Sequence, residues 1–396
     1  MQLHTVLKQQ AQELFEPLLA IRRHLHQHPE LSYQEHNTAS FVETQLTAWG
    51  IAHQRMAGTG VVALITGTQK TNPKTVALRG DMDALPIQEN TGLPFASQVP
   101  GVMHACGHDV HTTCLLGAAK LLQQNLSHFS GTVKLIFQPG EERNPGGASI
   151  LIKEGVLQNP APEAIIALHV HPGLETGKLS FRSGRVMASA DEIYITIKSK
   201  GGHAAAPHLT ADTVLITAHL ITSLQQIISR NNNPTSPSVL SICSIQGGHT
   251  TNVIPSEVKL MGTFRAMDEE WRYKAHELMK KQAVGLVEAM GAEIDFLIDV
   301  GYPTVDNEPQ LTQQCTQAAQ DMWGAENVLE TEMRMGAEDF GYYTKHIPGC
   351  FFRLGVRNEQ INAVHNVHTP TFIADEHAIP IGVATMAHLA IRYLEK

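Results

Sequence analysis

The sequence predicts an α/β protein in which a larger domain with a mostly parallel sheet carries a smaller, inserted ferredoxin-like domain. The length of 396 residues suits two or three domains. Short apolar runs alternate with helical patterns in the first and last parts of the chain, which is typical of a parallel sheet. Between them the order of elements changes to β-α-β-β-α-β. We therefore expect the larger domain to comprise 1–184 and 302–396, and the inserted domain to comprise 185–301.

The first part of the larger domain begins with two predicted helices. Apolar residues recur at helical spacing over Thr5–His28, and Pro29 ends this helix because the residue before a proline avoids the α conformation. A second helix is predicted over Glu35–Trp49 and a third over Val110–Gln124. Short apolar runs bounded by turn residues predict the buried strands Gly60–Thr66, Thr75–Arg79, Gly131–Phe137 and Ala164–Leu168.

The inserted domain begins where polar and apolar residues alternate, as in a half-exposed strand. Its predicted elements, in order, are the strand Glu192–Lys198, the helix Ala211–Arg230, the strands Ser238–Ile245 and Glu257–Arg265, the helix Glu269–Met290 and the strand Glu293–Val300. Pro303 and Pro309 mark the return to the larger domain, where Cys350–Gly355 is a predicted strand.

Composition excludes several classes of protein. The 29 Lys and Arg against 38 Asp and Glu give a net charge of −9 without basic clusters, so we expect no nucleic-acid partner. The N-terminus lacks a signal-peptide pattern, and no apolar stretch is long enough to span a bilayer, so we expect a cytoplasmic protein without a membrane partner. Five scattered cysteines fit reduced thiols better than disulfides. The 22 histidines are unusually many.

Polar residues that suit a metal ion gather where the predicted strands end. Ligands of α/β sheets bind beyond the carboxyl ends of strands, so these residues predict one polar pocket. Thiolate, imidazole and carboxylate groups together are what a divalent metal requires. The residues are Asp81, Asp83, Glu141, Glu142, His169 and His171, together with the segment His104–Asp109.

Each of these residues also has a purely structural interpretation. Cys106 by itself is more often a small buried apolar residue, Glu141 and Glu142 could form a solvated turn, and His169 could be a core histidine with its hydrogen bonds satisfied. The coincidence of all of them at strand ends favours a metal site.

Six motifs in order carry a resemblance that spans essentially the whole chain. The chain resembles the M20 metallopeptidase family, in the amidohydrolase branch that includes hippurate hydrolases, N-acyl amino acid hydrolases and plant indoleacetyl-amino-acid hydrolases. The motifs are Arg22–Ser32, Arg79–Pro86, His104–Asp109, Gln138–Glu142, Gly201–His208 and His368–Pro370.

The resemblance implies a centre of two divalent metal ions, manganese or zinc, and a general base. It implies that Glu141 is the base and that Asp83 orients a ligand, whereas Asp81 stands where other branches of the family have a ligating histidine. The implied ligands are Cys106, His108, Glu142, His169 and His368, of which composition alone does not single out His368.

The resemblance also implies that the inserted domain is a lid and often a dimerisation surface, which suggests a homodimer. It implies that His203 steadies the oxyanion of the reaction, often from the partner subunit, with His208 as the weaker candidate. Amide and guanidinium donors suit a substrate carboxylate, which points to Asn252 and Arg265. The structural alternatives are exposed loop histidines and, for Arg265, a surface charge.

We therefore expect metal-dependent hydrolysis of the amide bond of a small-molecule substrate, an N-acyl amino acid, in which Glu141 takes a proton from water and passes it to the leaving amine. The acyl group is not predicted. Three alternatives stay open: a carboxypeptidase or dipeptidase of the same family, a thiol hydrolase with Cys106 as nucleophile, and a binding protein that kept the fold without turnover.

Overall fold

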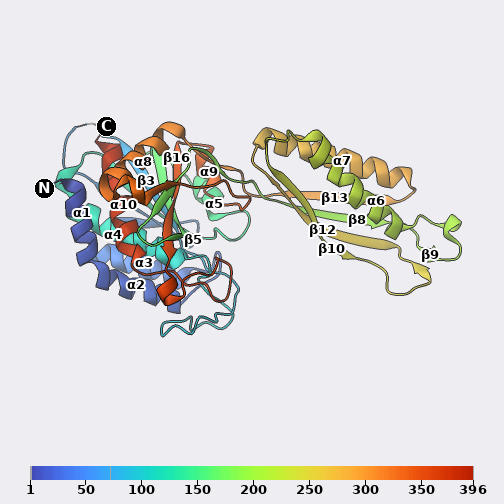
Figure 1. The fold of residues 1–396 in the computed structure, drawn as a ribbon, viewed down its shortest axis with the longest axis horizontal. Coiled ribbons are helices and arrows are strands. Elements are labelled where there is room, and N and C mark those ends of the chain that lie inside the picture. The colour runs from blue at the N-terminus through green and yellow to red at the C-terminus, as the bar shows by residue number, and fades with distance from the viewer. Residues whose placement is uncertain (1, 72, 396) are drawn as a thin grey trace. The chain divides into compact units, whose positions relative to one another are not determined.

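The computed structural model describes residues 2–71 and 73–395, which form two compact units. The large unit contains the chain up to Gly184, Asp306–Glu332 and the chain from Asp339 onward, and the small unit contains Arg185–Val305 and Met333–Glu338 (Figure 1).

The large unit is built on an eight-stranded mixed sheet with the order β1-β2-β4-β3-β5-β16-β6-β15. The central strands β4, β3, β5 and β16 pair in parallel, whereas β1 with β2, β2 with β4 and β6 with β16 pair antiparallel. The predicted α/β class is thus confirmed. The strands are β1 (Ala52–Met56), β2 (Gly60–Thr66), β3 (Thr75–Asp81), β4 (Thr132–Gln138), β5 (Ala164–Glu175), β6 (Leu179–Phe181), β15 (Val328–Glu330) and β16 (Gly349–Arg357).

Helices cover this sheet, and α4 and α10 pack against its central strands and against each other. Gly117 permits this packing, because a Cβ at that position would lie 2.4 Å from Cγ2 of Val383. The helices of the large unit are α1 (Leu3–Glu13), α2 (Phe15–Gln27), α3 (His36–Ala48), α4 (His108–Gln124), α5 (Gly147–Lys153), α8 (Pro309–Trp323), α9 (Gly341–Thr344) and α10 (Ala378–Leu394), with short 3-10 turns at Leu126–His128, Ala325–Asn327 and Glu359–Ile361.

Two predicted elements of the large unit differ substantially in extent from the structure, whereas the others differ by at most two residues at either end. The single helix predicted over Thr5–His28 is divided into α1 and α2 at Leu14. Pro17 has no backbone N–H, so it cannot donate to the carbonyl four residues earlier as a continuous helix would require. It is tolerated only in the first turn of a new helix. Strand β5 continues past Leu168 to Glu175, because it keeps pairing with β16. His169 therefore lies within a strand instead of after one.

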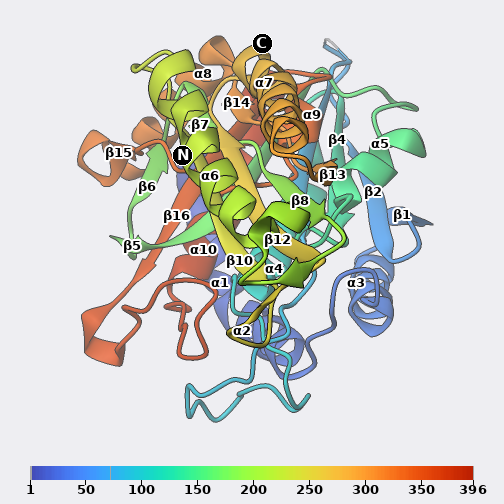
Figure 2. The ribbon, with the colours of Figure 1, turned by 90° about the vertical axis from the view of Figure 1, so that its right-hand side faces the viewer.

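The small unit has the predicted ferredoxin-like order β-α-β-β-α-β. Its antiparallel sheet has the order β10-β12-β8-β13, and α6 and α7 lie side by side on it (Figure 2). The elements are β8 (Asp191–Lys198), α6 (Thr213–Gln226), β10 (Ser238–Gln246), β12 (Glu257–Ala266), α7 (Glu269–Ala289) and β13 (Glu293–Val300). The shorter ones are β9 (Gly202–His203), the 3-10 turn Pro207–Leu209, the π-helical turn Ile227–Asn231 and β11 (Val253–Ile254). Two further short strands, β7 (Gly184–Met187) and β14 (Val305–Asn307), lie where the chain passes from one unit to the other.

Side-chain caps decide where the two helices of the small unit begin. The Asp212 carboxylate accepts the N–H groups of Val214 and Leu215, so α6 begins at Thr213, two residues later than predicted. Asp268 accepts the N–H of Trp271 in the same way at the start of α7. Of all the helices in the described ranges, none is long and apolar enough to cross a membrane.

Candidate metal centre

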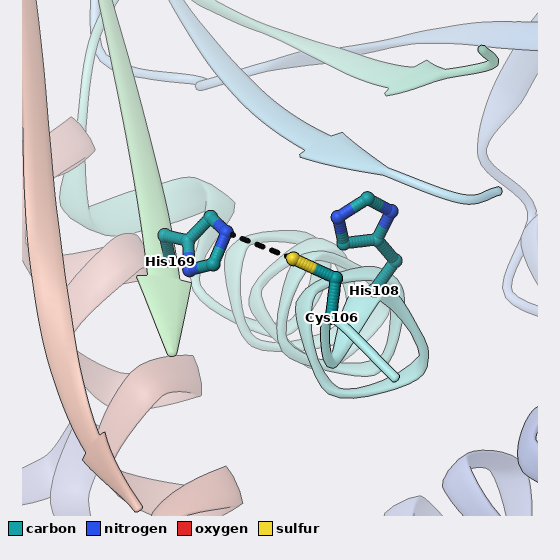
Figure 3. A group of neighbouring side chains, drawn as sticks. All are labelled: Cys106, His108 and His169. Atoms are coloured by element: carbon teal, nitrogen blue, oxygen red, sulfur yellow. Dashed lines mark hydrogen bonds between the residues drawn. The ribbon is translucent and has the colours of Figure 1, made fainter. Parts of the chain in front are cut away.

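Three predicted ligands meet at the start of α4. Cys106 lies in the preceding loop, His108 is the first residue of α4, and His169 comes from β5 (Figure 3). Cys106 Sγ lies 3.5 Å from His169 Nε2, and the ligand atoms of all three residues lie within 4.8 Å of one another. Gly107 is required here, because it adopts φ +82° and a Cβ would lie 2.6 Å from Cγ2 of Val170.

A second group contains Cys106 again, with Glu142 and His368. His368 Nε2 lies 3.1 Å from Glu142 Oε1. The backbone N–H of His368 donates to the carbonyl of Ala105 at 2.8 Å, which ties the His368 segment to the cysteine loop. This contact holds His368 at φ +63°, a left-handed conformation that is costly for a residue other than glycine. The Cys106 sulfur is therefore common to both groups.

Hydrogen bonds leave the Nε2 atoms of two histidines available as ligands. His169 Nδ1 lies 2.7 Å from the carbonyl oxygen of Val170, so Nδ1 carries the proton and Nε2 keeps its lone pair. His108 Nδ1 lies 3.2 Å from Asp83 Oδ1. His108 Nε2 is buried and has no hydrogen-bond partner among the described residues, although it lies 3.9 Å from Glu142 Oε1. A buried nitrogen that no protein group satisfies is a position where a metal ion or an ordered water can bind.

The charges at this centre also favour a bound cation. Burial raises the pKa of the Cys106 thiol, and the negative charge of Glu142 raises it further, so a thiolate here requires compensation by positive charge. Hydrogen bonds to Cys106 and Glu142 raise the pKa of His368 to about 10. Without a metal ion, the Cys106 thiol and the His368 ring therefore keep their protons. These protons occupy the lone pairs that would otherwise bind the ion.

Asp83 binds four donors from three parts of the chain. Its Oδ1 faces His108 Nδ1 and accepts the N–H of Glu141 at 3.0 Å. Its Oδ2 accepts the Ser32 hydroxyl at 2.6 Å and the N–H of Glu142 at 2.9 Å. Burial alone would raise the pKa of Asp83, but the hydrogen bond to His108 and the charge of that ring lower it overall. Asp83 thus fixes the side chain of the predicted ligand His108 and the backbone of Glu141 and Glu142.

Glu141 lies beside the candidate ligands. It is 5% exposed, and its carboxylate lies within 4.8 Å of the ligand atoms of His108 and Glu142. Glu141 Oε1 lies 3.4 Å from the backbone nitrogen of Asp339. A buried carboxylate at this distance can exchange a proton with a water molecule at the centre.

Asp81 has both oxygens occupied by other protein groups. Its Oδ1 faces His111 Nδ1 at 2.5 Å, and its Oδ2 faces Arg79 Nη1 at 2.5 Å. The other nitrogen of His111 accepts the N–H of Val170 at 2.9 Å. Burial alone would raise the pKa of Asp81, but the charge of Arg79 dominates and holds it well below its ordinary value. Asp81 therefore supports the strand that carries His169.

Sequence reasoning did not single out Arg79 and His111 as parts of this site. His111 follows His108 by one helical turn, so the spacing on α4 was the available signal. Two residues of the His104–Asp109 segment face helix α2 instead: Asp109 Oδ2 lies 3.0 Å from Arg22 Nε and 2.7 Å from His26 Nδ1, and the His104 ring lies against His26. His171 lies in β5, half-buried.

The small unit brings together two of its four predicted site residues. His203 of β9 pairs with Val253 of β11, and the N–H of Ala204 donates to the carbonyl of Asn252 at 3.0 Å. His203, Asn252 and also His208 are exposed. Half-buried Arg265 lies near the other end of β12, about 26 Å from Glu257 at the start of that strand, by 3.3 Å per residue.

Comparison with known proteins identifies the family. Residues 77–392 match the family described as Peptidase family M20/M25/M40. The chain belongs to this family. It is 40% identical over 392 residues to the IAA-amino acid hydrolase ILR1-like 5 of Arabidopsis thaliana, covering 97% of this chain and 88% of that protein. It is 38% identical over 395 residues to thermostable carboxypeptidase 1 of Saccharolobus solfataricus, covering 98% of each.

A solved structure supports the same family assignment. The YXEP protein of Bacillus subtilis, described as a dinuclear metal binding peptidase from the M20 family, superposes with a TM-score of 0.83 at 35% identity, covering 97% of this chain and 99% of that one. This M20 protein is accordingly a metal-dependent amide hydrolase, and the interpretations as a thiol hydrolase or as a binding protein without turnover are disfavoured.

Proposed function

We propose that this M20 hydrolase cleaves the amide bond of N-acyl amino acids at a centre of two divalent metal ions, with Glu141 as the general base. One observation carries the proposal: two groups of ligand atoms share the sulfur of Cys106. The proposed ligands are Cys106, His108, Glu142, His169 and His368.

The donor set fits metal ions of intermediate softness. Thiolate and imidazole suit zinc, and imidazole with carboxylate also suits manganese, so the ligand types are compatible with either. The unpartnered His108 Nε2 supports a ligand role for that residue. Two ions held by these residues would supply Lewis acidity to the amide carbonyl and to the attacking water.

Within this proposal, the protein's own residues move the proton and fix the geometry. Glu141 takes the proton of the attacking water at a carboxylate oxygen and delivers it to the leaving amine nitrogen, so that one group acts as base and then as acid. Asp83 keeps the His108 ring and the Glu141 backbone in fixed relation through its hydrogen bonds. Burial of Glu141 limits competition from bulk water.

The substrate class is supported by the relative named as an IAA-amino acid hydrolase. The relative named as a carboxypeptidase supports a second candidate, hydrolysis of the C-terminal peptide bond of short peptides. Both substrates carry a carboxylate next to a secondary amide, so the same centre can serve either. Only a direct comparison of the two substrate classes decides between them.

For the small unit, the proposal retains the roles expected from the sequence. His203 would stabilise the oxyanion, often from the partner subunit, with His208 as the weaker candidate. Asn252 and Arg265 would bind the substrate carboxylate. The small unit would act as the lid and as the interface of a homodimer. A monomeric mass in solution would contradict the role of the partner subunit. The cytoplasm is the proposed compartment, because the five free cysteines suit a reducing environment.

The test is a substrate panel on protein stripped of metal and refilled with manganese or zinc. We expect hydrolysis of N-acetyl, N-benzoyl and indoleacetyl amino acids only after refilling, at about two ions per chain. Faster hydrolysis of dipeptides than of every N-acyl amino acid would favour the second candidate. Full activity after exhaustive metal removal would refute the metal mechanism.

A further inference from the structure

The loop that carries Glu141 and Glu142 is held on one side by a short segment that follows helix α2. We propose that Glu35, in this segment, is a positioning residue for the base Glu141 and acts through the backbone of Gly140. The inference rests on the proposed function, since it concerns the placement of the proposed base.

Glu35 makes a direct contact with the backbone next to the base. Its side chain is fully buried, and Oε1 accepts the N–H of Gly140 at 2.8 Å and that of Tyr33 at 3.0 Å. Its Oε2 accepts the Thr59 hydroxyl at 2.6 Å. Gly140 directly precedes Glu141, so this carboxylate determines where the peptide that leads into the base lies.

Tyr33 holds the same loop at two further points. A Cβ at Gly140, which has φ +59°, would lie 2.3 Å from Cε1 of the Tyr33 ring, so the ring lies directly against the glycine backbone. The Tyr33 hydroxyl donates to the carbonyl of Arg143 at 2.7 Å and accepts the N–H of Gly146 at 3.0 Å. The loop is therefore bound before and after the two glutamates.

Asp83 holds the loop from the other side, through the N–H groups of Glu141 and Glu142. Three successive backbone N–H groups, of Gly140, Glu141 and Glu142, are thus bound by two buried carboxylates. This arrangement leaves the loop little freedom to shift along its length. A displacement of about 1 Å of a catalytic group can cost about 100-fold in rate, so such a restraint has a measurable effect.

The cost of burying Glu35 supports a specific role. Burial and the nearby charge of Asp83 raise the pKa of Glu35 to about 7, which shows that the ionised group is unfavourable at this position. An apolar residue would avoid this cost but would leave the N–H of Gly140 without a partner. Glutamine keeps an acceptor oxygen for both N–H groups and offers an N–H to Thr59, so Glu35→Gln is the conservative variant.

The experiment compares Glu35→Ala, Glu35→Gln and the matched control Glu30→Ala. Glu30 lies in the same segment and also accepts backbone N–H groups, but those of Asn37 and Thr38 at the start of α3. We expect Glu35→Ala to lower kcat by about 100-fold while KM and bound metal change less than about twofold. We expect Glu35→Gln to stay within about threefold of wild type in kcat, and Glu30→Ala to lower Tm with little change in kcat.

Hydrogen–deuterium exchange of the metal-free proteins gives a second readout that needs no turnover. Exchange at residues 140–146 should accelerate in Glu35→Ala and not in Glu30→Ala. Wild-type kcat in Glu35→Ala, an equal fall of kcat in Glu30→Ala, or loss of metal in Glu35→Ala would each overturn the positioning role. Failure of the proposed function is distinct: wild type would not hydrolyse N-acyl amino acids, or Glu141→Gln would be as active as wild type, whereas the exchange result would still test the contact.

Discussion

Asp83 Oδ1 lies 3.2 Å from Nδ1 of His108, and the same carboxylate accepts the backbone N–H groups of Glu141 and Glu142. One buried side chain, two residues after strand β3, therefore joins helix α4 to the loop after β4. Because these segments carry a proposed ligand and the proposed base, a change at Asp83 should affect metal binding and proton transfer together.

Replacement of Asp83 by alanine should weaken metal binding by about 10- to 100-fold and lower kcat as well, because His108 loses the group that orients it. Titration of metal-free protein with zinc or manganese measures the affinity. Asp295→Ala, which removes an exposed carboxylate paired with Lys198, is the control and should bind metal like wild type. Unchanged metal affinity in Asp83→Ala would contradict the orienting role.

Glu141→Gln should retain its bound metal but lose activity, with kcat lower by about 100- to 10,000-fold, since the amide cannot take a proton from water. Metal analysis and steady-state kinetics on the same sample check both statements. Glu154→Gln, at an exposed glutamate that accepts the N–H of Ala57, is the control. If metal is lost together with activity, Glu141 is a ligand and another group is the base.

Cys106→Ser should reduce the number of bound metal ions, because the sulfur is shared by both ligand groups and a serine hydroxyl is a poorer ligand at neutral pH. Elemental analysis of the purified variant measures this number. Cys243→Ser removes an exposed thiol on β10 and should leave metal content and activity unchanged. A Cys106→Ser variant with full metal content and no activity would favour a nucleophilic thiol.

Gly140→Ala should destabilise the protein more than Gly58→Ala. Both glycines have a positive φ, which costs an alanine about 1 to 2 kcal/mol. At Gly58 no described atom lies within 4 Å of the new Cβ, whereas at Gly140 the Tyr33 ring occupies the position, and such overpacking adds about 1 to 3 kcal/mol. Urea unfolding of the two metal-free variants gives the comparison. Equal losses would mean that the Tyr33 ring moves aside freely.

The raised pKa of Glu35 predicts how stability changes with pH. Since its pKa is about 7 in the folded protein against an ordinary 4.5, the folded state binds a proton between these values that the unfolded state has released. The free energy of unfolding should therefore fall as pH rises from about 4.5 to 7, by up to about 3 kcal/mol from this group.

Glu35→Gln lacks this titration and serves as the reference. The unfolding free energy of both proteins is measured with urea on metal-free protein at pH 5 and at pH 8. Relative to Glu35→Gln, wild type should be less stable at pH 8 than it is at pH 5. A difference that does not change with pH would show that Glu35 titrates at its ordinary value.

The sequence by itself was sufficient for the α/β class, for the ferredoxin-like order of the small unit and for strand β2, whose bounds Gly60–Thr66 agree with the prediction. These features depend on the spacing of apolar residues along the chain, which is local information. The chemical types of the candidate ligands were likewise visible, because thiol, imidazole and carboxylate groups recur near predicted strand ends.

Only the tertiary structure decided where those groups face. His169 lies inside β5 because pairing with β16 extends that strand, and Asp83 gathers donors from segments far apart in the sequence. Asn252 and Arg265 look equally suited to an anion, yet Asn252 lies beside the β9 segment and Arg265 lies near the C-terminal end of β12. Hydrogen-bond partners across a fold depend on how strands pair and helices pack, so periodicity along the chain carries no signal for them.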